Sequence, residues 1–285
     1  MSKIILVAET GSDITAELAQ RYSIQMVPMH VSFDNTTLDD GTFPAQQIVD
    51  YYKSTGKLPR TSGSTPEDFV SVFDRIHAEH PDAHILFLAY SAITTCSYQS
   101  AVIAAEDRDY ISMIDTRQVS VGQAAVVVEM AKYLQSNPDT TLDEAIAVAN
   151  DLISRANMCF LPDNLEFLRA GGRVSNAVAL GSRILSLHPT IEILNGKLTA
   201  TKKYRGKMEK VAAQLICDYS ETYNLDRSAP LWVIYTVGLA ESVKLAVNQT
   251  ASECGFKEVE WVLAHGVITT HGGPAAIGIA GFSKA

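Results

Sequence analysis

Short, unbroken apolar runs alternate along the chain with longer segments of helical periodicity, and this alternation limits the folds that the chain can adopt. Three apolar runs have the length and composition of buried strands: 4–8, 84–89 and 111–114. Helical patterns follow each of them across a polar loop, at 15–22, 98–106 and 119–134. Repeated units of strand, polar loop and helix predict a largely parallel sheet that is covered on both faces by helices.

A second unit of the same class is expected in the C-terminal half. A hairpin is predicted near 191–200, because an Asn-Gly pair suits the tight type I′ turn between two strand-like runs. Helices and strands then alternate in the order 206–219, 231–235, 241–254 and 258–264. We therefore predict an α/β protein of two domains, residues 1–157 and 158–285, whose sheets are mainly parallel and flanked by helices.

The composition excludes several classes of function. The chain has 47% hydrophobic and 19% charged residues, which is typical of soluble globular proteins. Its net charge of -9 argues against binding to nucleic acid, which depends on an excess of lysine and arginine. The four cysteines are far apart, so we expect no structural zinc or other metal site. The N-terminus lacks a signal-peptide pattern and no apolar run approaches the ~20 residues of a membrane span, so a cytoplasmic protein is expected.

Two loops rich in hydroxyl groups stand before predicted helices. Thr61, Ser62 and Ser64 precede a predicted helix. A proline follows Thr65 at the first helical position, and Asp68 lies three residues after Thr65. This pattern predicts a capping box, and simple capping and turn chemistry is the favoured interpretation. The other interpretation is an anion site, because free N–H groups at a helix N-terminus attract negative charge. Residues 90–97 form a second loop of the same kind.

A histidine near the C-terminus is the strongest single candidate for chemistry. His271 lies in the stretch Thr269–Pro274, beside paired glycines and a proline, where we expect a rigid turn after a strand. His271 with Ser97 could form a nucleophilic pair, although no third orienting residue is identifiable. Motifs for dinucleotides, for a P-loop and for zinc proteases do not occur, so these enzyme classes are not expected.

One cluster of basic residues departs from the acidic background. It follows the predicted hairpin and consists of Lys202, Lys203, Arg205, Lys207 and Lys210. A solvated helix face is one interpretation. The other is a docking site for an acidic partner, a phosphate group or an anionic membrane surface that is contacted transiently.

Five stretches carry a resemblance to a known family. They are 61–62, 97–101, 114–116, 165–174 and 271–274, and they include a Leu-x-x-Gly-Gly-Arg and a His-x-Gly-Pro pattern. In these stretches the chain resembles the DegV family, the bacterial fatty-acid-binding proteins that include the FakB subunits of fatty acid kinase. The resemblance covers essentially the whole chain and implies two α/β domains with a ligand between them.

The resemblance also implies a ligand and the residues that hold it. The ligand is a long-chain fatty acid in an apolar tunnel, with no further cofactor. Its carboxylate is expected to be held by Thr61, Thr95 and His271, with Ser62 and Ser97 as alternative donors. Hydroxyl groups and a histidine can bind a carboxylate without the large desolvation cost of a fixed charge buried in an apolar tunnel.

Members of the family are not expected to be catalysts by themselves. The resemblance implies that the chain presents the carboxylate to a separate ATP-dependent kinase, which forms the acyl phosphate, and that Arg173 and Arg205 serve in docking. Two alternatives remain open. One is a stand-alone acyl or phosphoryl transferase that uses Ser97 or Thr95 with His271, and the other is a carrier of a different amphipathic anion.

Overall fold

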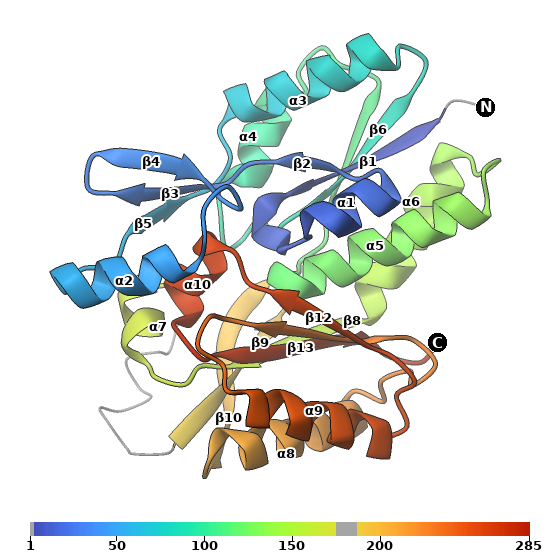
Figure 1. The fold of residues 1–285 in the computed structure, drawn as a ribbon. Coiled ribbons are helices and arrows are strands. Elements are labelled where there is room, and N and C mark those ends of the chain that lie inside the picture. Colours follow the sequence, from blue (N-terminus) through green and yellow to red (C-terminus); the bar gives the residue numbers. More distant parts are fainter. Residues whose placement is uncertain (1–2, 175–186) are drawn as a thin grey trace.

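The first sheet is parallel throughout, as predicted. The computed structural model describes residues 3–174 and 187–285 (Figure 1). The strands of this sheet lie in the order β2 (Gln25–Val27), β1 (Ile4–Glu9), β6 (His84–Ala89) and β7 (Ile111–Asp115). Because parallel strands end at the same edge, the polar loops after β1 and β6 lie next to each other.

Helices cover both faces of this sheet, and alternate residues of each strand face opposite layers. Ile5 and Val7 of β1 pack with α3 (Pro66–Glu79) and α4 (Ser97–Ala104). Leu6 and Ala8 pack with the other layer. That layer contains α1 (Ala16–Tyr22) and α5 (Ser120–Ser136), with α6 (Leu142–Arg155) packed beside α5. Strands buried on both faces explain why their sequences are continuous apolar runs.

The second sheet corrects the prediction of mainly parallel pairing. Its strands lie in the order β10 (Lys197–Arg205), β9 (Leu187–Leu194), β8 (Ala156–Leu161), β13 (Ile277–Phe282), β11 (Leu231–Tyr235) and β12 (Val259–Leu263). β11 and β12 are parallel, and every other neighbouring pair is antiparallel. The predicted hairpin β9–β10 is confirmed, and it accounts for one antiparallel pair. The α/β class holds for the whole described chain.

The unpredicted strand β13 causes most of the remaining antiparallel pairing. It lies between β8 and β11 and is buried along its whole length. A Cβ atom on Gly278 would lie 2.9 Å from the Cys159 carbonyl oxygen and 2.9 Å from Ile234 Cγ2. Only glycine fits so close an approach of two neighbouring strands, and glycine also weakens the sequence pattern of a strand.

A small third sheet carries one end of the candidate site. It is antiparallel, in the order β4 (Thr36–Asp39), β3 (His30–Phe33) and β5 (Arg60–Ser62). Strand β3 alternates half-buried and buried residues, whereas β4 is mostly exposed and β5 has three residues, so neither β4 nor β5 shows a clear strand pattern in the sequence. Helix α2 (Gln46–Thr55) follows β4 in the chain. Thr61, in the centre of β5, pairs with Val31 of β3.

Helix α5 lies between the first and second sheets (Figure 1). Its side chains are buried over most of its surface, as expected for a helix that is apolar nearly all round. Val126 and Val127 of α5 belong to one core that includes Leu88 of the first sheet and Trp232 of the second. The core is continuous between the sheets, and the domain boundary after residue 157 remains a prediction.

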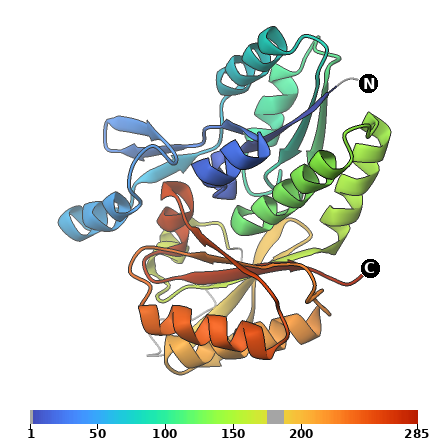
Figure 2. The ribbon, with the colours of Figure 1, turned by 45° about the vertical axis from the view of Figure 1, so that its right-hand side comes forward.

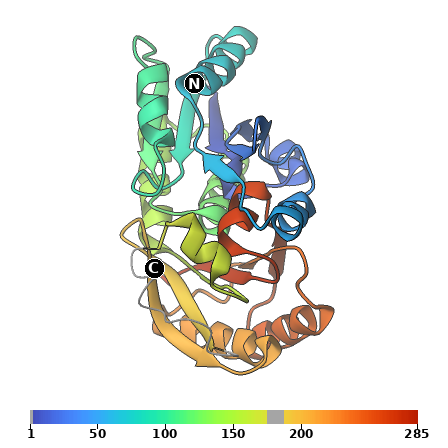
Figure 3. The same cartoon turned by 90° about the vertical axis from the view of Figure 1, so that its left-hand side faces the viewer.

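The stretch expected to be a rigid turn is a helix. Helix α10 (Gly266–Gly272) lies in the middle of the molecule, between the upper and lower sheets, in all three views (Figures 1, 2 and 3). Its sequence has low helix propensity, because four residues in a row are β-branched. Two buried carboxylates stabilise its first turn: Asp13 Oδ1 accepts from the His265 N–H at 2.7 Å and Asp40 Oδ1 from the Val267 N–H at 2.9 Å.

Two helices cover the outer face of the second sheet. They are α8 (Met208–Thr222) and α9 (Glu241–Glu253), and both lie below it in Figure 1. The short helix α7 (Glu166–Gly171) packs against α10. Within residues 3–174 and 187–285, every helix is too short or too polar to cross a membrane.

Candidate functional site

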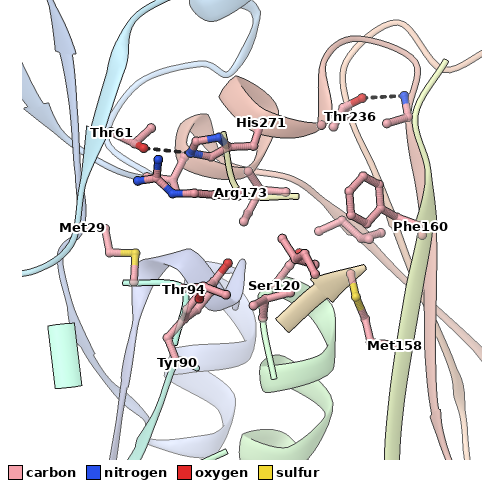
Figure 4. Close-up of a pocket in the computed structure, with 18 of the residues that line it drawn as sticks. Met29, Thr61, Tyr90, Thr94, Ser120, Met158, Phe160, Arg173, Thr236 and His271 are labelled. Carbon is pink, nitrogen blue, oxygen red and sulfur yellow. Dashed lines mark hydrogen bonds between the residues drawn. The ribbon is translucent and has the colours of Figure 1, made fainter. Parts of the chain in front are cut away.

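A pocket lies between the sheets and is lined by residues of the second and third sheets, of α10 and of the loop after β6. One end is polar and is formed by Thr61, Ser62, Thr94, Thr95, Arg173 and His271. The other end is mostly apolar and includes Met158 and Phe160, with Thr236 beside them (Figure 4), and the lining contains four further aliphatic residues: Val119, Leu198, Ile234 and Ile277. Figure 4 shows the polar group around Thr61 and Arg173 on one side and Met158 and Phe160 on the other. The shape suits a molecule with a polar head and an apolar body.

Thr61 and His271 meet at the polar end. The Oγ1 atom of Thr61 lies 2.8 Å from Nε2 of His271 (Figure 4). Thr61 comes from β5 of the third sheet, and His271 lies in the last turn of α10. The third sheet and α10 are in direct contact. The predicted convergence of these two side chains is therefore present in the structure, although their role in binding remains a prediction.

His271 is neutral at pH 7. Burial, and secondarily the positive charge of Arg173, lower the pKa of the imidazole from 6.5 to about 4. Its Nδ1 atom is buried without a hydrogen-bond partner among the described residues. If Nε2 carries the ring proton, His271 donates to Thr61 Oγ1, and the Thr61 hydroxyl keeps its own hydrogen for a ligand. That tautomer leaves only an acceptor unpaired at Nδ1.

A glycine determines where the His271 ring can lie. A Cβ atom on Gly171, at the end of α7, would be 2.3 Å from His271 Nδ1. Since real atoms do not approach so closely, the ring packs directly on the Gly171 backbone. The Leu-x-x-Gly-Gly-Arg stretch and the histidine are thus two sides of one contact, which the sequence alone did not show.

The second hydroxyl loop lies against the segment that follows Thr61. Ser97 Oγ accepts from the Ser64 N–H at 3.0 Å and lies 3.4 Å from Thr95 Oγ1. A Cβ atom on Gly63 would be 2.4 Å from Thr95 Oγ1 and 2.6 Å from Ser97 Oγ. Of the two hydroxyls, that of Thr95 borders the pocket, while Ser97 is fully buried behind it.

The contacts of Ser97 bear on the transferase alternative. His271 Nε2 contacts Thr61, and within the described residues no hydrogen bond joins His271 to Ser97 or Thr95. A general base must be within hydrogen-bond reach of the nucleophile that it activates. The geometry therefore gives no support to a Ser97–His271 or Thr95–His271 nucleophilic pair.

Helix α3 has the predicted capping box. Asp68 Oδ2 accepts from the Thr65 N–H at 2.7 Å, and Thr65 Oγ1 accepts from the Asp68 N–H at 3.3 Å. His30 Nε2 contacts the same Asp68 oxygen at 2.8 Å. The capping interpretation of this helix N-terminus is confirmed. The network also braces the segment that carries Thr61, because His30 pairs with Ser62 across β3 and β5.

Arg173 lies at the pocket, where the sequence predicted only a docking role. Its guanidinium points toward Thr61 and His271 in Figure 4, and its Nη1 donates to the Gly171 carbonyl oxygen at 2.9 Å. The side chain is nevertheless exposed to solvent. A permanent positive charge thus stands at the mouth of the pocket, without being buried in its apolar part.

Arg205 lies elsewhere. It is exposed at the end of β10 and is not among the described residues that line the pocket. Its neighbour Lys202 is engaged in an ion pair with Asp218, which also accepts from the Tyr204 hydroxyl at 2.8 Å. Part of the basic cluster is therefore paired within the chain, and Arg205 remains exposed.

Buried acids lie behind the pocket, at the carboxyl end of β1. Burial raises the pKa of Glu9 from 4.5 to about 7 and that of Asp13 from 3.8 to about 7. Glu9 Oε2 accepts from the Tyr90 N–H at 2.9 Å and from Gln123 Nε2 at 2.8 Å. Among the described residues, no three histidine, cysteine or acidic side chains are grouped to hold a metal ion. These acids link the first sheet to its neighbours.

Sequence reasoning missed the part that Tyr90 and Ser120 play in the site. Both line the pocket, Tyr90 directly after β6 and Ser120 at the start of α5. In open α/β sheets, ligands bind outside the carboxyl ends of the strands. That rule could have singled out Tyr90, the first residue after a predicted strand.

Together these features define a class of protein: an α/β protein whose sheets enclose a pocket for a molecule with a polar head and an apolar body. The family model described as "Uncharacterised protein, DegV family" matches residues 3–284, and the chain belongs to the DegV family. The resemblance found in the sequence is therefore confirmed.

Relatives and solved structures agree with this assignment. The chain is 26% identical over 279 residues to a DegV domain-containing protein of Deinococcus radiodurans, covering 97% of each chain. It is 24% identical to a fatty acid-binding protein of Thermotoga maritima, over 97% of this chain and 96% of that protein. A solved DegV family protein from Thermus thermophilus, described by its fatty acid binding, has a TM-score of 0.87 and 25% identity, covering 99% of this chain and 100% of that one. The α/β fold is thus shared over the full length.

Proposed function

We propose that the chain binds one long-chain fatty acid in the pocket between its sheets. The observation that carries this proposal is the contact of Thr61 with His271 at the polar end of a pocket whose other end is mostly apolar. A fatty acid has the matching form, with one anionic head and a long apolar tail. The relatives from Thermotoga maritima and Thermus thermophilus, which are described by fatty acid binding, support the same ligand class.

The head of the ligand is assigned to three side chains, which we call the carboxylate clamp: Thr61, Thr95 and His271. The Thr61 hydroxyl donates to one carboxylate oxygen while neutral His271 donates to Thr61, and Thr95 supplies a second hydroxyl. Ser62 borders the same space, and Ser97 positions Thr95 from behind. Hydrogen bonds to an ionised oxygen are about twice as strong as neutral ones, so a few donors suffice.

Arg173 complements the clamp from the solvent side. Its guanidinium is exposed and adds long-range attraction for an anion that enters the pocket. The tail then lies along Met158, Phe160 and Ile234, where its burial drives binding at about 0.8 kcal/mol for each methylene. Charge selects the head, and apolar surface provides most of the affinity.

We propose further that the chain presents the bound carboxylate to a separate ATP-dependent fatty acid kinase and has no catalytic residue of its own. Exposed Arg205 and Arg173 are the proposed docking residues. Two observations support this division of labour. The clamp residues lie beside exposed Arg173, and within the described part of the chain His271 makes no hydrogen bond to Ser97 or Thr95. The proposed partner uses ATP, which is consistent with the predicted cytoplasmic localisation of the chain.

Mass spectrometry tests the ligand assignment directly. Organic extraction of the freshly purified chain should release long-chain fatty acids in about one equivalent. Recovery of no lipid would overturn the proposal, and recovery of a different amphipathic anion would favour the alternative carrier function. Turnover of an acyl ester by the purified chain alone, lost in His271→Ala, would instead establish the transferase alternative.

A further inference from the structure

A buried tyrosine in the pocket has a hydroxyl group without a partner. Tyr90 is 8% exposed and lines the pocket. Within residues 3–174 and 187–285, its phenolic oxygen makes no hydrogen bond. The oxygen is not among the buried polar atoms that lack a partner, so it faces the open space of the pocket and can bond to the molecule that fills it. The arrangement indicates that a bound molecule supplies the missing partner.

The ring of Tyr90 is held rigidly, so the hydroxyl has a defined position. Its main-chain N–H donates to Glu9 Oε2 at 2.9 Å. A Cβ atom on Gly11 would lie 3.3 Å from Tyr90 Cε2, so the ring packs against the loop after β1. Tyr90 lies across the pocket from Thr61 and His271 in Figure 4.

Two further hydroxyl groups border the same part of the pocket, and both have already used their hydrogens. Thr94 Oγ1 donates to the Ser91 carbonyl oxygen at 2.9 Å, and Ser120 Oγ donates to Asp13 Oδ2 at 2.6 Å. Both oxygens can therefore only accept from a ligand. This wall of the pocket offers one free donor, at Tyr90, and two acceptors.

The chemistry of this wall does not suit a carboxylate. An anion would face two acceptor oxygens, with the Asp13 carboxyl directly behind Ser120. A methylene group would leave the Tyr90 hydroxyl unpaired. A hydroxyl group suits this wall, because it accepts from Tyr90 and donates to one of the two acceptors, Thr94 or Ser120.

We propose that the pocket selects fatty acids that carry a hydroxyl group close to the carboxylate, at the second or third carbon. The inference rests on the proposed function, since the carboxylate must be held by the clamp for the hydroxyl to meet Tyr90. The place along the chain follows from the layout in Figure 4: Tyr90 and Thr94 lie at the end of the pocket that holds Arg173 and His271, whereas Met158 and Phe160 lie at the other end.

A binding comparison with delipidated protein tests this proposal. The probes are hexadecanoic acid, its 2-hydroxy and 3-hydroxy forms, and 16-hydroxyhexadecanoic acid, in which the hydroxyl lies at the far end. We expect one of the two near-head hydroxy acids to bind at least about tenfold more tightly than hexadecanoic acid, because the site is built to pair that group. The 16-hydroxy acid should bind no better than hexadecanoic acid.

The variant Tyr90→Phe separates the hydroxyl from the ring. It should abolish the preference, so that the hydroxy acid and hexadecanoic acid bind this variant with equal affinity, because neither then meets a phenolic hydroxyl. Tyr51→Phe is the matched control, because the Tyr51 hydroxyl bonds to Asp34 on the surface, and the preference should survive in it. Thermal unfolding of each variant checks that the fold is retained.

Each remaining outcome has a clear meaning. Equal affinity of the wild-type protein for all four acids would overturn the inference and leave fatty acid binding intact. An equal loss for plain and hydroxy acids in Tyr90→Phe would overturn it too, and would assign Tyr90 to the carboxylate or to an ordered water. Failure of every acid to bind would overturn the proposed function itself.

Discussion

Thr61 and His271 are 210 positions apart in the chain, yet Thr61 Oγ1 and His271 Nε2 are separated by 2.8 Å. The first belongs to a short edge strand and the second to the last turn of a short helix. Their contact joins the third sheet to the segment that leads into β13. The polar end of the pocket therefore depends on the whole fold being assembled.

Replacement of Thr61 by valine keeps the shape of the side chain and removes its hydroxyl group. We expect Thr61→Val to weaken fatty acid binding by about 10- to 100-fold, because a hydrogen bond to a charged group contributes about 1.5–3 kcal/mol. Isothermal titration with hexadecanoic acid measures the change. Thr37→Val is the control: Thr37 of the exposed strand β4 bonds to Ser32 of β3, and this variant should bind hexadecanoic acid normally. Equal affinities of wild type and Thr61→Val would rule out Thr61 as a carboxylate ligand.

A methyl group on Gly171 should displace the His271 ring, since the added atom would lie 2.3 Å from Nδ1. Gly171→Ala should therefore separate His271 from Thr61 and weaken fatty acid binding by about tenfold, the loss of one hydrogen bond. In Gly172→Ala the methyl group enters open space, and the cost is confined to a backbone with φ of 63°. That control should lose a little stability and keep its affinity. The same loss of affinity in both variants would contradict the assignment.

The buried carboxyl of Asp13 should make stability depend on pH. Burial raises its pKa from 3.8 to about 7, so the folded state holds the proton more tightly than the unfolded state. Its contribution to stability is fully present below pH 3.8 and is lost as the pH rises through 7. Asp13→Asn mimics the protonated form and should lack this loss. Its free energy of unfolding should therefore rise relative to that of the wild type by at most about 1.4 kcal/mol for each pH unit between 3.8 and 7. Urea unfolding between pH 4 and 8 measures the difference, and parallel curves for the two proteins would refute the prediction.

The two arginines should separate ligand binding from partner coupling. Arg205 is exposed and remote from the pocket lining, so Arg205→Ala should lower acyl phosphate formation with a partner kinase and ATP while leaving lipid content intact. Arg173 lines the pocket, and Arg173→Ala should lower both. Arg75→Ala removes an equal charge from α3, where Arg75 contacts Gln25, and should change neither. Loss of lipid in Arg205→Ala would show that the docking assignment is wrong.

Much of the fold was predictable because its determinants are local. The apolar run of β6 and the Thr65–Asp68 capping box each depend on residues that are adjacent or three apart. The hairpin β9–β10 likewise depends on an Asn-Gly turn. Interactions of short range leave a pattern that a sequence displays directly.

The features that were missed depend on distant contacts. Helix α10 is capped by Asp13 and Asp40, which are 252 and 227 positions away from the groups that they bind. Strand β13 contains Gly278 because of its neighbours Cys159 and Ile234, and glycine obscures the strand pattern. Neither cause can be seen in the local sequence.

The candidate site was predictable only in part. Thr61, Thr95 and His271 came from the resemblance to the DegV family, and the structure brings Thr61 and His271 into contact. The position of Arg173 at the pocket and the unpaired Tyr90 hydroxyl were not foreseen. Both depend on how the loops after separate strands meet, which no motif encodes.

The capping of α10 by Asp13 and Asp40 has a consequence for any attempt to divide the molecule. A cut between residues 157 and 158 would place His271 on one fragment and, on the other, Thr61 together with both carboxylates that stabilise the helix of that histidine. Neither fragment would hold a fatty acid by its head. If the gene were split at this point, the two products would bind a fatty acid only after they reassociated. Binding therefore requires both halves of the chain together.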